Sequence, residues 1–160
     1  MVMGIEIERK FLVSSEGWRG MVTESRTLRD GLIGRFGEGK VRVRVCGEEA
    51  TLTVKGPRDG LRRAEYEYRI PVSDAEELLS LSIVPVLEKT RHVVRYSGTT
   101  WQVDVYAGLL GGLVLAEVEL EREDQEIELP DWVGREVTGE PEYRKANLLA
   151  RWPGAMTPAR

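Results

Sequence analysis

Apolar and polar residues alternate along much of this chain. Side chains two positions apart share one face of a β-strand. In the opening segment GIEIERKFLV (4–13), one face therefore carries Glu6, Glu8 and Lys10, while the other is mainly apolar. We predict a strand here. The same alternation recurs at 40–45, 50–56, 62–70, 87–96, 101–108 and 113–121.

Two further patterns complete the predicted elements. Another strand of uncertain register falls within 24–33. Ser73 followed by Glu76 forms a capping-box pattern, which predicts a helix with Ser73 as its N-cap. The segment 141–152 reads as a second helix, ended by Pro153. About eight strands with a few flanking helices predict an α+β fold built on a closed eight-stranded antiparallel barrel. No linker interrupts the chain, so we predict a single domain over 1–153 and a tail at 154–160.

Composition narrows the class of protein. The net charge of −4 over 160 residues gives no indication of a nucleic-acid or membrane-surface partner. No apolar run approaches the length of a membrane span, and the single Cys46 suits a reducing compartment, so we predict a cytoplasmic protein. With one histidine, His92, and one thiol, any metal site needs oxygen ligands, which favours Mg²⁺ or Mn²⁺.

Charged residues occupy one face of almost every predicted strand, in blocks of one sign. For any one strand alone, a solvent-facing sheet surface with cross-strand ion pairs is the simpler interpretation. For the whole set, the dominance of arginine and carboxylates favours a charged interior. The acidic positions are Glu6, Glu8, Glu65, Glu67, Asp104, Glu117 and Glu119, and the basic positions are Lys10, Arg42, Arg44, Lys55, Lys89, Arg91 and Arg95.

Such an interior suits a chain of phosphates. The planar fork of arginine matches phosphate oxygens with paired hydrogen bonds. Carboxylates would repel the same polyanion unless a divalent cation lay between them, and carboxylate oxygens are the ligands that Mg²⁺ prefers. The segregated charges therefore predict a site for a polyphosphate and a divalent metal.

The residues also resemble a known family. Glu6-Ile7-Glu8-Arg9-Lys10 matches the ExExK signature of the CYTH domain, the triphosphate tunnel metalloenzymes. The blocks KVRVRV, TLTVKGP, RRAEYEY, EKTRH, WQVDVYAG, LVLAEVELE and EYRKANLLA resemble successive blocks of that family over nearly the whole chain. The resemblance implies a tunnel with inward charges that hydrolyses or cyclises triphosphates.

The resemblance also implies roles for individual residues. Glu6, Glu8, Glu117 and Glu119 would bind the metal, and Asp104 would assist a second ion or the attacking water. Lys89 or Arg91 would support the leaving diphosphate. Glu65 and Glu67 would order the site. The phosphates would be bound by Lys10, Arg42, Arg44, Lys55, Lys89 and Arg91. Lys145 is either a further phosphate contact at one mouth of the tunnel or a solvated helix residue.

One departure from the family pattern concerns the predicted strand at 24–33. Family members of this size often carry Gln-Gly-Tyr-Leu there, whereas this chain has Asp30-Gly31-Leu32-Ile33. Leu32 therefore stands where that tyrosine would be. This chain then lacks the phenol at this position for any step that uses it, and its substrate preference is expected to be affected.

Three functions follow from this interpretation. The first is a metal-dependent triphosphatase that acts on inorganic tripolyphosphate or on another triphosphate, such as thiamine triphosphate or a nucleotide. The second is a class IV-type adenylate cyclase that makes cyclic AMP from ATP. The third is a polyphosphate- or nucleotide-binding module with little turnover. The expected partner is a small-molecule triphosphate, without nucleic acid or membrane, and a homodimer is left open.

Several other residues are expected to be structural. His92 should face outward, and Trp101 should lie in the core with its neighbours Val103 and Val105. Cys46 has no base partner in the sequence, so it is not expected to act as a nucleophile. Arg9 lies on the apolar face and is expected to reach solvent.

Overall fold

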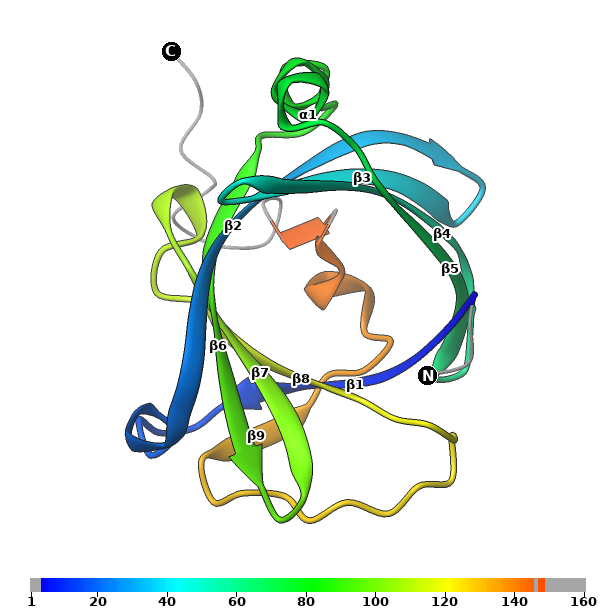
Figure 1. Cartoon of the computed structure of the whole chain (residues 1–160). Helices are drawn as coiled ribbons and strands as arrows, with labels where there is room; N and C mark the ends of the chain where they lie inside the picture. The colour runs from blue at the N-terminus through cyan, green and yellow to red at the C-terminus, as the bar shows by residue number, and fades with distance from the viewer. Residues whose placement is uncertain (1–3, 146, 149–160) are drawn as a thin grey trace.

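Eight antiparallel strands close into a barrel. The computed structural model of the chain describes residues 4–145, 147 and 148. The barrel strands are β1 (Ile5–Val13), β2 (Val22–Phe36), β3 (Gly39–Cys46), β4 (Glu49–Asp59), β5 (Arg62–Arg69), β6 (Leu87–Tyr96), β7 (Thr99–Tyr106) and β8 (Val114–Glu119). Strand β1 closes the ring because it pairs with β8 through one part of its length and with β5 through another. Figure 1 views this ring nearly end-on. The predicted eight-stranded barrel is confirmed.

A ninth strand, β9 (Val133–Glu136), was not predicted from the sequence. It pairs with the end of β1, where Phe11 faces Glu136 and Val13 faces Val133. This strand also corrects the expectation for Arg9. The Arg9 guanidinium donates to the Glu136 carboxylate, with Nη2 to Oε1 at 2.7 Å, and lies 5.0 Å from the centre of the Phe11 ring. Arg9 thus forms an ion pair on the outer wall instead of extending freely into solvent.

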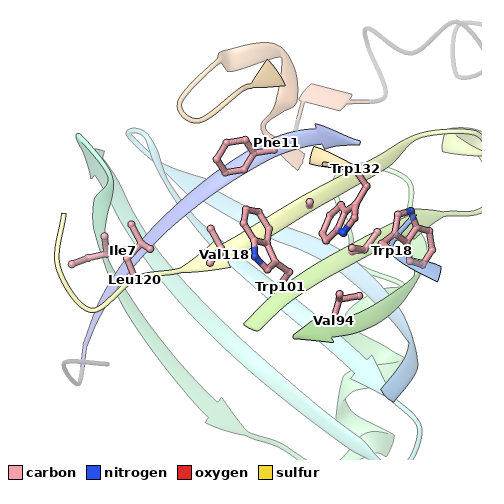
Figure 2. Close-up of a cluster of buried hydrophobic side chains, with 10 residues drawn as sticks. Ile7, Phe11, Trp18, Val94, Trp101, Val118, Leu120 and Trp132 are labelled. Carbon is pink, nitrogen blue, oxygen red and sulfur yellow. The ribbon is translucent and has the colours of Figure 1, made fainter. Parts of the chain in front are cut away.

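The largest apolar cluster packs on the outside of the barrel wall. Strand alternation turns Trp101 and Val103 away from the interior that receives Asp104, and both are fully buried. The Trp101 ring lies 5.5 Å from Phe11 and 5.6 Å from Trp132, centre to centre. Figure 2 shows these rings on the outer side of β1, β7 and β8. The barrel is therefore stabilised by apolar burial outside its wall, which leaves the interior available for charge.

Two further segments, a 3₁₀ turn and a helix, pack against the outer face of the barrel. The 3₁₀ turn η1 (Arg19–Met21) follows Trp18, and His92 packs against the Trp18 ring at 5.1 Å between centroids, so the predicted outward position of His92 is confirmed. Helix α1 (Val72–Leu79) covers part of the outer face of the barrel (Figure 1) and packs Ala75 and Leu79 into a second apolar cluster.

The predicted N-cap of this helix is wrong by two residues. The helix begins at Val72, and Ser73 makes no capping hydrogen bond. Pro71 is extended and its carbonyl oxygen accepts the Ala75 N–H at 3.0 Å, so the proline occupies the cap position instead. Glu76, the other half of the predicted capping box, forms an ion pair with Arg29 of β2.

The remaining elements lie near one end of the barrel. Turn η2 (Gly108–Leu110) places Leu110 in a third apolar cluster with Leu148. Turn η3 (Pro141–Tyr143) is followed by a bend at Arg144. The predicted helix 141–152 is therefore only partly right, because helical residues begin at Lys145 and positions 149–152 lie outside the described residues, as does the predicted tail 154–160. Within residues 4–145, 147 and 148, no helix is long and apolar enough to cross a membrane.

Candidate active site

A layer of paired charges crosses the middle of the barrel. Asp104 accepts hydrogen bonds from the Lys89 ammonium at 2.8 Å and from two nitrogens of Arg91, both at 2.8 Å. Lys89 is 1% exposed and Asp104 is fully buried. Buried charges persist only when they are paired. The structure therefore brings together the three residues for which the sequence predicted a catalytic role.

Asp30 is the residue of this layer that sequence analysis missed. Its carboxylate accepts two hydrogen bonds from Arg44, at 2.7 and 2.8 Å, and lies 3.9 Å from the Lys89 ammonium. Burial alone would raise the pKa of Asp30, but Arg44, Arg42 and Lys89 hold that pKa well below its usual range. Strand alternation from Leu32 would have placed Asp30 inside. Its role depends on partners from β3 and β6, which the local sequence does not show.

Glu117 connects this layer to a group of lysines. Its carboxylate lies 3.4 Å from Arg91 and 3.8 Å from the ammonium groups of both Lys10 and Lys145. Burial would raise the pKa of Glu117, but Lys145, Lys10 and Arg91 outweigh it and hold the pKa well below the ordinary value. The Oε1 atom accepts no hydrogen bond from any described residue. Glu117 is thus an ionised carboxylate with a free acceptor atom.

Three more carboxylates gather on β1 and β8. Glu8 and Glu119 face each other directly across the two strands, and Glu6 follows along β1. Burial, Glu117 and Glu6 raise the pKa of Glu8, while burial, Glu6 and Glu8 raise that of Glu119. Like charges that face each other across a strand pair destabilise the fold. A cation between them would relieve this repulsion.

The chemistry of these carboxylates fits a hard divalent metal ion. They offer only oxygen ligands, one buried acceptor has no hydrogen bond, and their mutual repulsion raises two pKa values. Among the side chains that the structure describes, no three acidic, histidine or cysteine groups lie close enough together to hold an ion. Lysines compensate the acids instead, since the Lys55 ammonium lies 3.1 Å from both Glu6 and Glu65.

Arg42 lies opposite the acidic strands and is only partly satisfied. Its Nη2 donates to the Thr53 hydroxyl at 3.4 Å and lies 3.9 Å from Glu67, whereas its buried Nε has no hydrogen-bond partner among the described residues. Burial and the neighbouring Arg44 lower its pKa. The guanidinium therefore keeps donor capacity for an anion.

One end of the barrel opens into a cavity of about 240 Å³, which we call the cationic mouth. Its lining includes the buried Glu8 and Lys55. The other lining cations are Lys10, Arg35, Lys40, Arg58, Arg63, Arg144 and Lys145. Sequence analysis gave no role to Arg35, Lys40, Arg58, Arg63 or Arg144. Alternation along β3 puts Lys40 in phase with Arg42, a signal that could have identified it.

Lys40 shows how strongly the cations are crowded there. It faces Lys55 directly across β3 and β4. Burial, together with Lys55 and Arg63, lowers the pKa of Lys40 to about 7. An ammonium group with a pKa this low is one that an incoming anion would stabilise.

Lys145 is not a solvated helix residue. It projects into the interior, lines the cationic mouth, and lies within 3.8 Å of Glu117. Burial lowers its pKa, and Lys89, Arg42 and Arg44 act in the same direction. The first of the two alternatives drawn from the sequence, a position at one mouth of the tunnel, is thus the one that the geometry favours.

Leu32, where the family resemblance led us to expect a tyrosine, forms an apolar wall. Its side chain is buried, and together with Val84 and Leu87 it lines a small recess beside Lys40 and Lys145. The phenol nearest to the central layer belongs to Tyr106, whose ring centre lies 5.4 Å from the Lys89 ammonium. The buried Tyr106 hydroxyl has no hydrogen-bond partner in the part of the chain that the structure describes.

The opposite end of the barrel contains a second cavity of about 340 Å³, which we call the mixed mouth. Its charged lining is balanced in sign and consists of Glu24, Arg26, Arg44, Glu49, Glu67 and Arg91. Cys46 also lines it and is partly buried.

Together these features define a class of protein: a closed antiparallel barrel whose interior sets a carboxylate group against a basic wall. The chain belongs to the CYTH domain family, whose model matches residues 4–152. It is 45% identical over 148 residues to an inorganic triphosphatase of Acetivibrio thermocellus, covering 92% of this chain and 94% of that protein. It is 36% identical over 152 residues to an inorganic triphosphatase of Nitrosomonas europaea, covering 92% and 99%.

Solved structures agree with this assignment. The crystal structure of an inorganic triphosphatase superposes with a TM-score of 0.64 at 34% identity, covering 92% of this chain and 95% of that one. A Hippeastrum protein described as having a dominant triphosphatase activity superposes with a TM-score of 0.57, covering 73% and 80%. At 15% identity, this second likeness concerns the fold alone.

Proposed function

We propose that this protein is a divalent-metal-dependent triphosphatase that hydrolyses inorganic tripolyphosphate. The observation that carries the proposal is the juxtaposition, inside one barrel, of crowded carboxylates on β1 and β8 with the cations Arg42 on β3 and Lys55 on β4, of which Arg42 keeps an unpaired buried Nε. Two relatives named inorganic triphosphatase, at 45% and 36% identity over almost their whole length, support the choice of substrate.

Glu6, Glu8, Glu117 and Glu119 are the residues that would hold Mg²⁺ or Mn²⁺. When bound, such an ion supplies Lewis-acid polarisation of a phosphoryl oxygen and activation of water. Glu117 is held ionised, because four neighbouring cations lower its pKa. Glu65 and Glu67 reach the same interior, where they pair with Lys55 and Arg42 and keep these cations in place.

The basic wall would bind and orient the phosphate chain. Arg42 has an unpaired buried Nε, and Lys10 and Lys55 point into the cavity beside Glu8. These groups would hold the negative charges of a triphosphate in line for attack by water on a terminal phosphorus atom. The one buried interior hydroxyl that contacts a carboxylate in the described residues, that of Thr53, donates to Glu67 at 3.2 Å, accepts from Arg42 and has no exposed surface, so we assign it no nucleophilic role and propose no covalent intermediate.

Asp104 has a different role from the one predicted. Both of its oxygens already accept hydrogen bonds from Lys89 and Arg91, and it has no exposed surface. We therefore assign it to the positioning of these two cations instead of to a second metal or the attacking water. Held in this way, Lys89 and Arg91 present fixed positive charge to the diphosphate that leaves.

A substrate panel tests this function. Purified protein is incubated with tripolyphosphate, thiamine triphosphate or ATP, with Mg²⁺ or Mn²⁺ or with neither, and phosphate and cyclic AMP are measured by separate assays. We expect metal-dependent release of phosphate, fastest from tripolyphosphate. Cyclic AMP formed from ATP faster than phosphate from tripolyphosphate would identify an adenylate cyclase. Tight binding of tripolyphosphate without turnover would identify a binding module.

A further inference from the structure

The two mouths of the barrel differ sharply in charge. The cationic mouth is lined by eight basic and three acidic residues, whereas the mixed mouth is lined by three of each. They lie at opposite ends of the β3–β4 pair, since Lys40 and Lys55 face each other at one end and Cys46 and Glu49 at the other. The barrel therefore has an electrostatic direction along its axis.

Ion pairs between side chains increase the difference in charge between the two mouths. At the mixed mouth every arginine is bonded to an acid: Arg26 to Glu24 at 2.5 Å, Arg44 to Asp30 at 2.7 Å and Arg91 to Asp104 at 2.8 Å. At the cationic mouth, in the described part of the chain, neither Arg35 nor Lys40 has a carboxylate within 4 Å. The positive charge that remains free for a ligand is thus concentrated at one end.

Arg35 and Lys40 belong to the same β-hairpin and differ in depth. Arg35 is exposed on β2, and Lys40 is half-buried directly opposite it on β3, where it also faces Lys55 of β4. Lys55 in turn contacts Glu6 at 3.1 Å. Unpaired positive charge therefore extends from the solvent-exposed rim, where Glu38 in the turn of this hairpin is its single acidic residue at the mouth, through Lys40 to Lys55 and the carboxylates of β1.

The route from the mixed mouth is obstructed. The two cavities share no lining residue. Between them lies the layer in which the buried Lys89 ammonium bridges Asp104 and Asp30. A polyanion arriving from that side would meet neutralised arginines and the acids Glu24, Glu49 and Glu67.

We propose that the linear phosphate substrate enters through the cationic mouth alone, and that Arg35 and Lys40 recruit it without taking part in the chemical step. This inference rests on the proposed triphosphatase function. Unpaired charge around a cleft raises the local concentration and the association rate of an oppositely charged ligand, and salt screens the effect. The two residues therefore determine access and affinity for chains of phosphate, while the groups around Glu8 determine turnover.

The test compares Arg35→Gln/Lys40→Met with Arg26→Gln, which removes a positive charge at the mixed mouth. Tripolyphosphate hydrolysis is measured at about 0.01 M and about 1 M salt, where the Debye lengths are about 30 and 3 Å. For the double variant we expect kcat/KM to fall about tenfold at low salt, with kcat within about twofold of wild type, and the deficit to shrink at high salt. Arg26→Gln should change kcat/KM by less than about twofold.

An unchanged kcat/KM in the double variant, or an equal loss in Arg26→Gln, would overturn the proposal. Misfolding is excluded if the unfolding midpoint of the double variant equals or exceeds that of wild type, which we expect because Lys40→Met removes an ammonium group that faces Lys55. If wild-type protein releases no phosphate, the proposed function fails. In that case calorimetric titration with tripolyphosphate decides separately: about tenfold weaker binding by the double variant supports recruitment at this mouth, and equal binding refutes it.

Discussion

Lys89, Arg91 and Asp104 form a buried group in which one carboxylate pairs with two cations. Sequence alternation and family resemblance predicted that these residues point inward together. Neither showed that Asp104 would be fully enclosed, nor that Asp30 would complete the group from β2. Strand alternation could have placed both Asp30 and Lys40 in the interior, but the charged groups around them come from other strands and leave no local signal in the sequence.

Removing the central carboxylate should destabilise the protein strongly. Asp104→Asn leaves Lys89 and Arg91 buried without their shared counter-ion. Breaking a buried ion pair from one side costs about 3–5 kcal/mol. We expect a decrease of that size in the free energy of unfolding, measured by urea denaturation. Glu24→Gln, which breaks an exposed ion pair with Arg26, is the matched control and should leave the unfolding midpoint nearly unchanged. Equal stability of the two variants would contradict the buried pairing.

Lys40 should make stability depend on pH in a defined window. Its pKa is lowered to about 7 by burial and by Lys55, from about 10.5 in the unfolded chain. Between these values the unfolded state binds more protons than the folded state, so this residue makes stability rise with pH. Lys40→Met should therefore be more stable than wild type below pH 7, and this advantage should shrink as pH rises from 7 towards 10. Thermal unfolding of both proteins across that range measures it, and a pH-independent difference would contradict the lowered pKa.

At the scale of elements, most strands could be predicted from the sequence. The barrel wall has an apolar outer face and a charged inner face, so apolar and charged residues alternate strictly along its strands. The short β9 could not be predicted, since its four residues carry no alternating apolar run and are ordered by pairing with β1. The start of α1 was placed two residues late because Pro71, and not Ser73, occupies the cap. The conformation of the chain as it leaves β5, and not the local capping pattern, determines where this helix begins.

The contact between α1 and the barrel depends on a glycine in β2. A Cβ atom at Gly31 would lie 3.0 Å from Leu79 Cδ2 and 3.3 Å from Val43 Cγ1. Gly31→Val should overpack this contact and lower the free energy of unfolding by about 1–3 kcal/mol. Gly34→Val, on the same strand, is the control, because a Cβ atom added at Gly34 would have no neighbouring atom within 4 Å. Denaturant titration measures both, and an equal effect of the two substitutions would argue against close packing of α1 on Gly31.

The molecule as a whole places its apolar core outside the barrel and its charges inside. Trp101, Phe11 and Trp132 form that outer core, and the strands supply the opposite, charged face from the same alternation. This arrangement was foreseeable because the charges are too segregated by sign for an ordinary solvent face. The electrostatic direction of the barrel was not foreseeable, because it depends on which cations find a partner in three dimensions.

The crowded carboxylates of the barrel lower the stability of the metal-free protein, although the proposed function needs them. Glu8→Gln removes a carboxylate whose pKa is raised by burial and by Glu117 and Glu6. The free energy of unfolding of the metal-free protein should therefore stay equal or rise by up to about 1 kcal/mol, because a like-charge pair across β1 and β8 is relieved. A large loss of stability, measured by thermal unfolding without metal, would contradict this picture of the acidic group.

The most direct test of the central claim is tripolyphosphate hydrolysis by wild type and Glu8→Gln as a function of Mg²⁺ or Mn²⁺ concentration, with Glu24→Gln as the surface control. We predict that wild type and the control release phosphate only when the metal is present, and that Glu8→Gln, although folded, is at least about 100-fold slower at saturating metal. Full activity of Glu8→Gln, or equal wild-type rates with and without metal, would contradict the account.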